Sequence, residues 1–324
     1  MPSRSGHPSK LKSGANRGLR VEYPNPKLLP PANTFTHIEQ SYRRFGTLYH
    51  MKVELVILAD NTADRDDLTA EHGLAIFISG PRRKVLLDAG ASGATLLSNA
   101  SALGIDLSAL DAVVISHGHY DHTGGLASVV QQRPGLPVYV HSGAFDRRYA
   151  DRPGKPLKDI SCPHSIEALY QAGAVFHSVS RPEPLADWLV VSGPIAGPEH
   201  GGNVFVVRKA GELVIDGFED EMCLLVRGQR GWAVLTGCCH RGLGNTIRLA
   251  RSLIHDEPLT TLVGGMHLAN NDQAGIDEAL ELIEKYAIRD IYTCHCTQPG
   301  AVNQLQQALG DRLHPMSVGS RVAL

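Results

Sequence analysis

Three histidines and an aspartate lie within six consecutive positions, in the segment His117-Gly118-His119-Tyr120-Asp121-His122. Imidazole and carboxylate groups are the side chains that bind zinc and neighbouring transition metals. In an extended loop alternate residues share a side, so His117 and His119 face one position, while Asp121 and His122 turn towards a second. We therefore predict a metal site here; the alternative is a polar loop that is merely rich in histidine.

The residues around this cluster indicate how it is held. Residues 112–115 form an apolar, β-branched run that is typical of a buried strand. Residues 126–130, which follow two glycines, are typical of the start of a helix. The cluster is therefore expected on a tight loop at the carboxyl end of a strand, where open sheets usually bind their ligands.

The same arrangement recurs three times later in the chain. Three apolar runs, each typical of a strand, are followed closely by a histidine: His240, His267 and His295. Because the strand ends of one sheet lie along one edge, we expect these histidines to meet the loop at residues 117–122. One such histidine would more often be structural, but three in succession favour a shared metal site.

The composition excludes several classes of partner. The 31 basic residues nearly balance the 33 acidic ones, so neither nucleic acid nor an anionic membrane is expected as a partner. No stretch approaches the roughly 18 apolar residues of a membrane span, and no apolar signal region begins the chain. The six cysteines are too sparse for a disulfide scaffold, which predicts reduced thiols in a cytoplasmic protein. The sequence leaves the oligomeric state open.

The chain is expected to divide into a tail and one domain. Residues 1–33 are rich in Ser, Gly, Pro, Lys and Arg, and this composition predicts a flexible tail. In the domain, residues 34–324, several expected strands come first and strands then alternate with helices. This order favours two mixed sheets with helices on both outer faces. Residues 145–163 are expected to form a surface excursion that could act as a lid.

The segment His-x-His-x-Asp-His followed by Thr-Gly-Gly, at residues 117–125, resembles the metal motif of the metallo-β-lactamase superfamily. This resemblance extends from about residue 50 to the C-terminus. It implies an α/β (α+β) fold, a four-layer αββα sandwich in which two mixed β-sheets are flanked by helices. It also implies that Asp88, at the end of an expected strand, orients the metal loop rather than binding metal.

Other segments resemble a narrower branch, the dihydropteroate-synthase-like group, which is named for an enzyme assigned to methanopterin biosynthesis. The segments that carry this resemblance are residues 236–240, 264–268 and 294–297, together with residues 60–62 and 71–73. Asp60, Asn61 and Glu71 are therefore candidates for contacts around the site. Because a ligating histidine needs a partner on its other ring nitrogen, Asp88 and Asp60 are the candidate partners.

The chain departs from the superfamily pattern at two points: in the loop before the bridging metal ligand, and at that ligand itself. The superfamily usually supplies a further histidine from a loop before the bridging ligand, but the matching residues 218–222 offer only carboxylates, Asp220 among them. Cys238 stands where the bridging ligand is usual. Cys238 and His240 therefore compete for one role, and we favour His240.

Together these segments give a ligand set for two divalent ions, with Zn²⁺ first and Mn²⁺ or Fe²⁺ as alternatives. The candidate ligands are His117, His119, Asp121, His122, His240, Cys238 and, in competition for the last position, His267 and His295. Such ions can generate hydroxide at neutral pH. Asp121 would also orient that hydroxide, and Asp121 and His240 are the candidate catalytic residues.

These features predict a metal-dependent hydrolase that attacks an ester, lactone, thioester or phosphoester bond of a small molecule. One alternative, implied by the branch, is a synthase that joins a pterin or arylamine to a phosphorylated sugar. Basic residues of the excursion could then hold a phosphate: Arg147, Arg148, Lys155 and Lys158. A second alternative is a non-catalytic module that senses or scaffolds through its metal.

Overall fold

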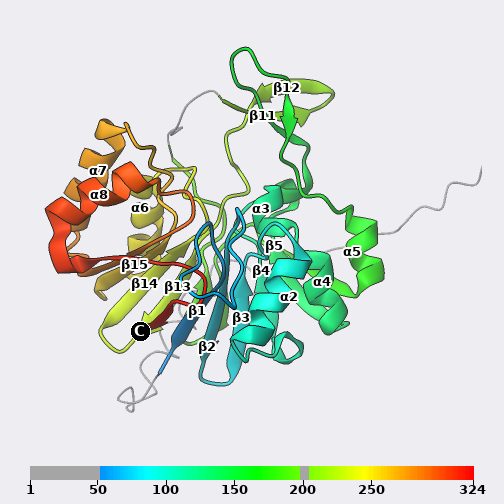
Figure 1. Ribbon diagram of the computed structural model, residues 1–324, viewed down its shortest axis with the longest axis horizontal. Helices are drawn as coiled ribbons and strands as arrows, with labels where there is room; N and C mark the ends of the chain where they lie inside the picture. Colours follow the sequence, from blue (N-terminus) through cyan, green and yellow to red (C-terminus); the bar gives the residue numbers. More distant parts are fainter. Residues whose placement is uncertain (1–51, 198–203) are drawn as a thin grey trace, which may run out of the picture. The chain divides into compact units, whose positions relative to one another are not determined.

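A computed structural model gives the structure of residues 52–197 and 204–324 (Figure 1). The predicted tail at residues 1–33 lies outside the described residues, as does the start of the predicted domain. The described chain forms two seven-stranded sheets, a four-stranded sheet and flanking helices.

The first large sheet carries the histidine-rich loop at the end of a central strand. Its strands in spatial order are β18 (Arg321–Ala323), β1 (Glu54–Ala59), β2 (Ala75–Gly80), β3 (Arg83–Leu87), β4 (Ala112–Val114), β5 (Leu136–Val140) and β8 (Ala174–Ser178). Strands β3, β4, β5 and β8 are parallel, and the other pairs are antiparallel. On one face lie α2 (Gly93–Ala102), α4 (Leu126–Gln132) and α5 (Ile166–Ala172) (Figure 1).

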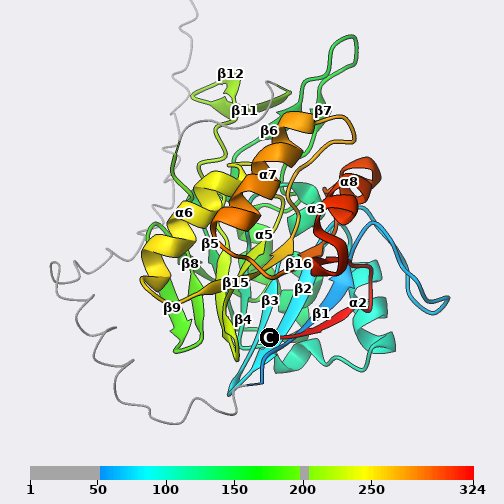
Figure 2. The ribbon, with the colours of Figure 1, turned by 90° about the vertical axis from the view of Figure 1, so that its left-hand side faces the viewer.

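The second large sheet contains the three later histidine segments. Its strands in spatial order are β17 (Leu313–Pro315), β16 (Asp290–Thr293), β15 (Leu259–Gly264), β14 (Gly231–Thr236), β13 (Leu224–Gly228), β10 (Leu189–Val191) and β9 (Glu183–Ala186). Strands β14 to β17 are parallel, and the others are antiparallel. The outer face is covered by α6 (Leu243–Ile254), α7 (Gln273–Lys285) and α8 (Pro299–Leu309), which face the viewer in Figure 2.

Alternation of side chains along the strands produces the layers. In β1, Leu55 and Ile57 belong to the apolar core between the two sheets, whereas Val56 packs with the helices of the first sheet. In β14, Leu235 lies in the core between the sheets and Val234 packs with the helices of the second. Because both faces of each sheet are buried, the strands are continuous apolar runs in the sequence. The predicted four-layer αββα sandwich of two mixed sheets is confirmed.

A third, four-stranded sheet was not expected from the sequence. It consists of β12 (Glu212–Ile215), β11 (Phe205–Lys209), β6 (Arg148–Ala150) and β7 (Lys158–Asp159). Strands β6 and β7 lie in the predicted surface excursion at residues 145–163, and β6 pairs with β11 from a distant part of the chain. With three and two residues, β6 and β7 are too short to show a periodic pattern. Movement of this excursion as a lid stays a prediction.

The remaining elements are short. They are α3 (Tyr120–Thr123) and three 3₁₀ helices, at Leu107–Ala109, Ser142–Phe145 and Gly310–Arg312. None of the described helices combines the length and apolar character that a membrane crossing requires. All six cysteines lie in the described residues and are free thiols.

Candidate metal centre

Four strand ends meet at one edge of the sandwich. Strands β14, β15 and β16 are adjacent and parallel, so their carboxyl ends point the same way and deliver His240, His267 and His295. His240 and His295 contact the loop that follows β4, and His267 lies beside His240. The ring centroids of His117 and His240 are 4.9 Å apart, as are those of His122 and His295. The structure therefore brings the three later histidines and the histidine-rich loop together.

The first candidate metal position consists of His117, His119 and His240. Their ligand atoms lie within 4.8 Å of one another. The Nε2 atom of each ring is buried and has no hydrogen-bond partner, which costs free energy unless another group satisfies it. One divalent ion would satisfy all three lone pairs, so these residues fit a metal in geometry and in chemistry.

The protonation of these rings suits metal binding. Burial, with the neighbouring charges, lowers the pKa of His119 to about 3 and the pKa values of His117 and His240 well below the ordinary value. All three rings are therefore neutral at neutral pH. The Ser116 hydroxyl donates to Asp88 Oδ2 at 2.7 Å and accepts from His117 Nδ1 at 2.9 Å, which leaves the ring's lone pair on Nε2.

The second candidate position consists of Asp121, His122 and His295. The Nε2 atoms of His122 and His295 are 3.2 Å apart, and Asp121 Oδ2 lies 3.9 Å and 3.5 Å from them. The other ring nitrogens are held by Asp88 Oδ2, 2.6 Å from His122 Nδ1, and by Asn61 Oδ1, 3.1 Å from His295 Nδ1. Both rings thus present Nε2 to the same point, as the ligands of one ion would.

Charge at the second position favours a cation. Burial alone would lower the pKa of His122, but Asp88 and Asp121 outweigh it and raise that pKa to about 9. Burial likewise opposes ionisation of Asp121, yet His122, His295 and other neighbours hold its pKa well below the ordinary value. Positive charge is therefore stabilised here, and a divalent ion could replace the proton on His122.

Cys238 lies between the two positions. Its Sγ is 3.2 Å from His122 Nε2, and it forms candidate ligand groups with His240 and His267 and with His295. The pairs that the sequence left in competition occupy different points in the structure. His240 lies in the first position and His295 in the second, while His267 stands beside His240 with ring centroids 4.3 Å apart.

The predicted surrounding residues lie at different distances from the centre. Asp60 accepts from the backbone N–H of His295 at 2.8 Å, and Asp220 accepts from that of Gly118 at 2.8 Å. Both carboxylates thereby fix the backbone of a ligand-bearing loop. The Glu71 carboxylate instead accepts from the hydroxyl of the serine at the start of α2 at 2.8 Å.

Three groups at the centre were not among the predicted site residues. The exposed imidazole of His72 has its Nε2 3.2 Å from Asp121 Oδ2. Glu221 accepts from the backbone N–H of His240 at 2.7 Å, and burial raises its pKa to about 7. Phe218 stacks on the His240 ring with centroids 4.0 Å apart. All three lie in segments that the resemblance had already marked, residues 71–73 and 218–222, but the apolar side chain of Phe218 gave no signal of a metal site.

Backbone strain is concentrated at this edge. Phe218, Cys239, His267 and His295 all have positive φ, at 49°, 68°, 51° and 53°. Such conformations cost of the order of 1–3 kcal/mol each in side chains other than glycine, and they persist mainly at functional sites. The strain turns the histidines at the ends of β15 and β16 back towards the loop after β4.

Gly118 provides the first test of the loop. A Cβ at this position would lie 1.9 Å from the carbonyl oxygen of Ala144. We expect Gly118→Ala to lower the free energy of unfolding by about 1–3 kcal/mol and to weaken metal binding, because the backbone between His117 and His119 must shift. Thermal unfolding and metal titration measure both effects. Gly217→Ala is the control, since the nearest atom to its Cβ is 3.9 Å away; equal behaviour of the two variants would contradict the expectation.

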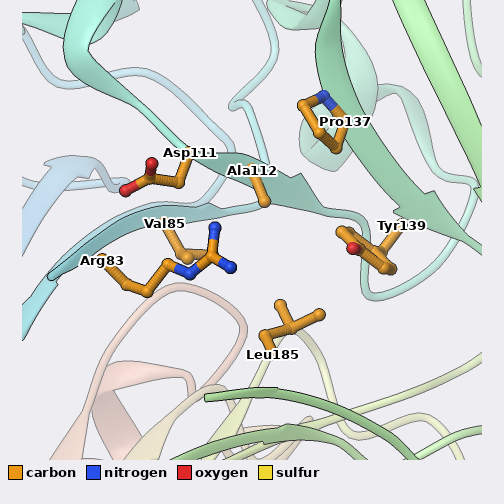
Figure 3. A pocket seen from close by; sticks show the side chains of 7 residues that line it. All are labelled: Arg83, Val85, Asp111, Ala112, Pro137, Tyr139 and Leu185. Atoms are coloured by element: carbon orange, nitrogen blue, oxygen red, sulfur yellow. The ribbon is translucent and has the colours of Figure 1, made fainter.

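A small pocket lies away from the histidines (Figure 3). It is lined by Arg83, Val85, Asp111, Ala112, Pro137, Tyr139 and Leu185. Arg83 begins β3 and Asp111 directly precedes β4, so the pocket is at the amino end of these strands. The histidine-rich loop follows the carboxyl end of β4, and the pocket therefore belongs to a different part of the sandwich.

Comparison with known proteins supports one family. The family described as the Metallo-beta-lactamase superfamily matches residues 68–174 of this chain. Among solved structures, the chain is similar to the crystal structure of a metal-dependent hydrolase of the β-lactamase superfamily. The two share 28% sequence identity and a TM-score of 0.72, and the match covers 85% of this chain and 99% of the other.

Two proteins of Methanocaldococcus jannaschii are also similar over most of their length. One is 7,8-dihydropterin-6-methyl-4-(β-D-ribofuranosyl)-aminobenzene-5′-phosphate synthase, which is 24% identical over 81% of this chain and 94% of its own length. The other is an uncharacterized protein that is 28% identical over 78% of this chain and 93% of its own length. The named relatives therefore include both a hydrolase and a synthase.

Proposed function

Because the chain belongs to the metallo-β-lactamase superfamily, we propose that it is a metal-dependent hydrolase acting on an ester, lactone, thioester or phosphoester of a small molecule. The observation that carries this proposal is the convergence of three buried, unpartnered Nε2 atoms at His117, His119 and His240. Divalent ions bound there and at the second position would supply hydroxide at neutral pH and polarise the bond to be cleaved.

The residues of the chain itself would prepare that reaction. Asp121 is ionised, because neighbouring histidines hold its pKa well below the ordinary value, so its carboxylate can accept a hydrogen bond from an attacking water and orient it. His72 reaches Asp121 from the exposed side, with 58% of its side chain accessible. It is placed to exchange a proton between Asp121 and solvent or substrate. Phe218 is buried beside His240 and keeps water away from that side of the metal centre.

The second candidate function is a synthase that acts on a pterin or arylamine and a phosphorylated sugar. It is favoured by the similarity to the archaeal synthase, which spans most of both chains. The structure restricts which basic residues could hold a phosphate. Arg148 is buried between Asp216 and Asp220 and so is not available, and Arg147 pairs with Asp159. Lys155 and Lys158 remain, and Lys158 has its Nζ 5.2 Å from the centroid of the Tyr120 ring.

Substrate screening separates these functions. Purified protein loaded with Zn²⁺, Mn²⁺ or Fe²⁺ would be assayed on phosphodiesters, lactones and thioesters, beside the His117→Ala/His119→Ala variant purified in the same way. Hydrolysis that is lost in the variant supports the hydrolase. Silence on every hydrolytic substrate, with turnover of a pterin and a phosphoribosyl donor, would support the synthase instead. Binding of ligands without any turnover would contradict both and favour a sensing or scaffolding module.

A further inference from the structure

A second thiol lies at the metal centre beside Cys238. Cys238 follows β14 and Cys296 follows β16, so the two thiols reach each other across the end of the intervening strand β15. Cys296 Sγ is 3.2 Å from the carbonyl oxygen of Cys238. The ligand atoms of Cys238, Cys296 and His295 all lie within 4.8 Å of one another.

The residue that directly follows β15, Gly265, leaves room for this approach. A Cβ at Gly265 would lie 2.4 Å from Cys296 Sγ and 3.3 Å from Cys238 Cα. Any other residue here would therefore displace the thiol or the backbone that carries the other cysteine. Glycine at this point is what allows the side chain of Cys296 to occupy the space between the neighbouring strand ends.

Cys296 differs from the other thiols in its exposure to solvent. Five of the six cysteines are buried, and Cys296 alone is partly accessible. A buried cysteine commonly packs as a small apolar residue, which suffices to explain Cys294. Cys296 instead lies beside the imidazole of His295 and the thiol of Cys238, with all three ligand atoms within 4.8 Å of one another. Packing alone does not account for that environment.

We propose that Cys296, together with Cys238 and His295, is a metal ligand, so that the ion at the second position has two sulfur ligands. Two thiolates and one imidazole form a donor set that suits zinc and other thiophilic ions, whereas Mn²⁺ and Mg²⁺ prefer oxygen. The proposal rests on the metal centre of the proposed function, but not on hydrolytic activity.

Thiolate ligands are detectable without any substrate. The reduced full-length protein would be titrated with Co²⁺ and with Cd²⁺, and thiolate-to-metal charge-transfer absorption recorded in the near ultraviolet. We expect this absorption in the wild type and its reduction by about half or more both in Cys238→Ser and in Cys296→Ser, because each substitution removes one of two sulfur ligands. Cys162→Ser, which changes a cysteine that belongs to no candidate ligand group, should keep the full absorption.

Two results would overturn the proposal. One is a metal-loaded wild type without charge-transfer absorption, and the other is absorption that is unchanged in Cys296→Ser. If the serine variant does not fold, alkylation of the wild type decides instead. Bound Zn²⁺ should protect Cys296 from N-ethylmaleimide by at least about tenfold, as measured by peptide mass spectrometry, and equal labelling with and without Zn²⁺ rules out ligation. These measurements do not depend on turnover, so they can be interpreted even if the protein proves not to be a hydrolase.

Discussion

Replacing His117 and His119 together by alanine is expected to remove at least one of about two metal equivalents and to reduce turnover by more than about a hundredfold. Both rings are fully buried, and both point an unpartnered Nε2 at the same position. Loss of a residue that merely orients a ligand already costs about 10–100-fold in metal affinity or activity, so loss of two ligands should cost more. Metal analysis of the purified protein and kcat/KM on the best substrate measure the two effects.

A matched control distinguishes ligand loss from the removal of any two imidazoles. His177 and His314 each stack on a tyrosine, with ring centroids 4.8 Å and 4.6 Å apart, and neither belongs to a candidate ligand group. The His177→Ala/His314→Ala variant should therefore keep its metal and its activity. Full metal retention in the His117→Ala/His119→Ala variant would remove the basis of the proposed centre.

The sequence could predict that the histidines after successive strands meet at one edge, because neighbouring parallel strands run in the same direction. Once β14, β15 and β16 are adjacent, a histidine just past each end must lie along one edge. The sequence could not tell which histidine reaches which position, because that depends on turns at strained residues. Cys239 has a φ of 68° immediately before His240, and no local pattern predicts a left-handed conformation for a cysteine.

The sequence also could not show which of two adjacent residues holds the ring of a ligating histidine. Asp60 was expected to hold the ring of a ligating histidine, but Asn61 Oδ1 is the group next to His295 Nδ1, while Asp60 accepts from the His295 backbone N–H. Adjacent residues of an extended segment point to opposite sides, so a shift of one position exchanges these roles. The segment could be predicted, but the residue that holds the ring could not.

The third sheet illustrates a different limit. All four residues of β12 are exposed, although three of them are the apolar residues Leu213, Val214 and Ile215. The alternation that marks a half-buried strand is therefore absent. Strand β6, which pairs with β11, contributes Arg148, whose charge suggested a surface residue, yet the residue is buried. The distant Asp216 and Asp220 neutralise its charge and so make that burial possible, and the sequence does not pair them with it.

This buried arginine leads to the second large expected effect. Arg148 donates from Nε to Asp216 at 2.8 Å and from Nη2 to Asp220 at 2.7 Å, and all three side chains are buried. Replacing Arg148 by methionine leaves buried carboxylates without their counter-charge. Breaking such a pair costs about 3–5 kcal/mol, and we expect a loss of that size in the free energy of unfolding. Denaturant unfolding of the metal-free protein at neutral pH measures it.

The adjacent residue supplies the control. Arg147 pairs with Asp159 at 3.3 Å, but both side chains are at least half exposed. An exposed pair contributes about 0–1 kcal/mol, so Arg147→Met should change stability little. The two variants differ by one position in the chain and remove the same charge, so only burial separates them. Equal losses in Arg147→Met and Arg148→Met would show that the buried network does not stabilise the fold.

The loss in Arg148→Met should also depend on pH with a definite sign. Burial raises the pKa of Asp220 above its ordinary value, and Arg148 opposes that rise, so removing the arginine raises the pKa further. A carboxyl group with a higher pKa in the folded than in the unfolded chain binds more protons when folded, and stability then falls as pH rises. The deficit of Arg148→Met should therefore grow as the pH rises above the ordinary carboxyl pKa of about 4. Because Asp220 also accepts from the backbone N–H of Gly118, metal affinity should weaken in parallel. If the loss in free energy of unfolding does not change with pH, it arises from packing rather than from the unpaired charge.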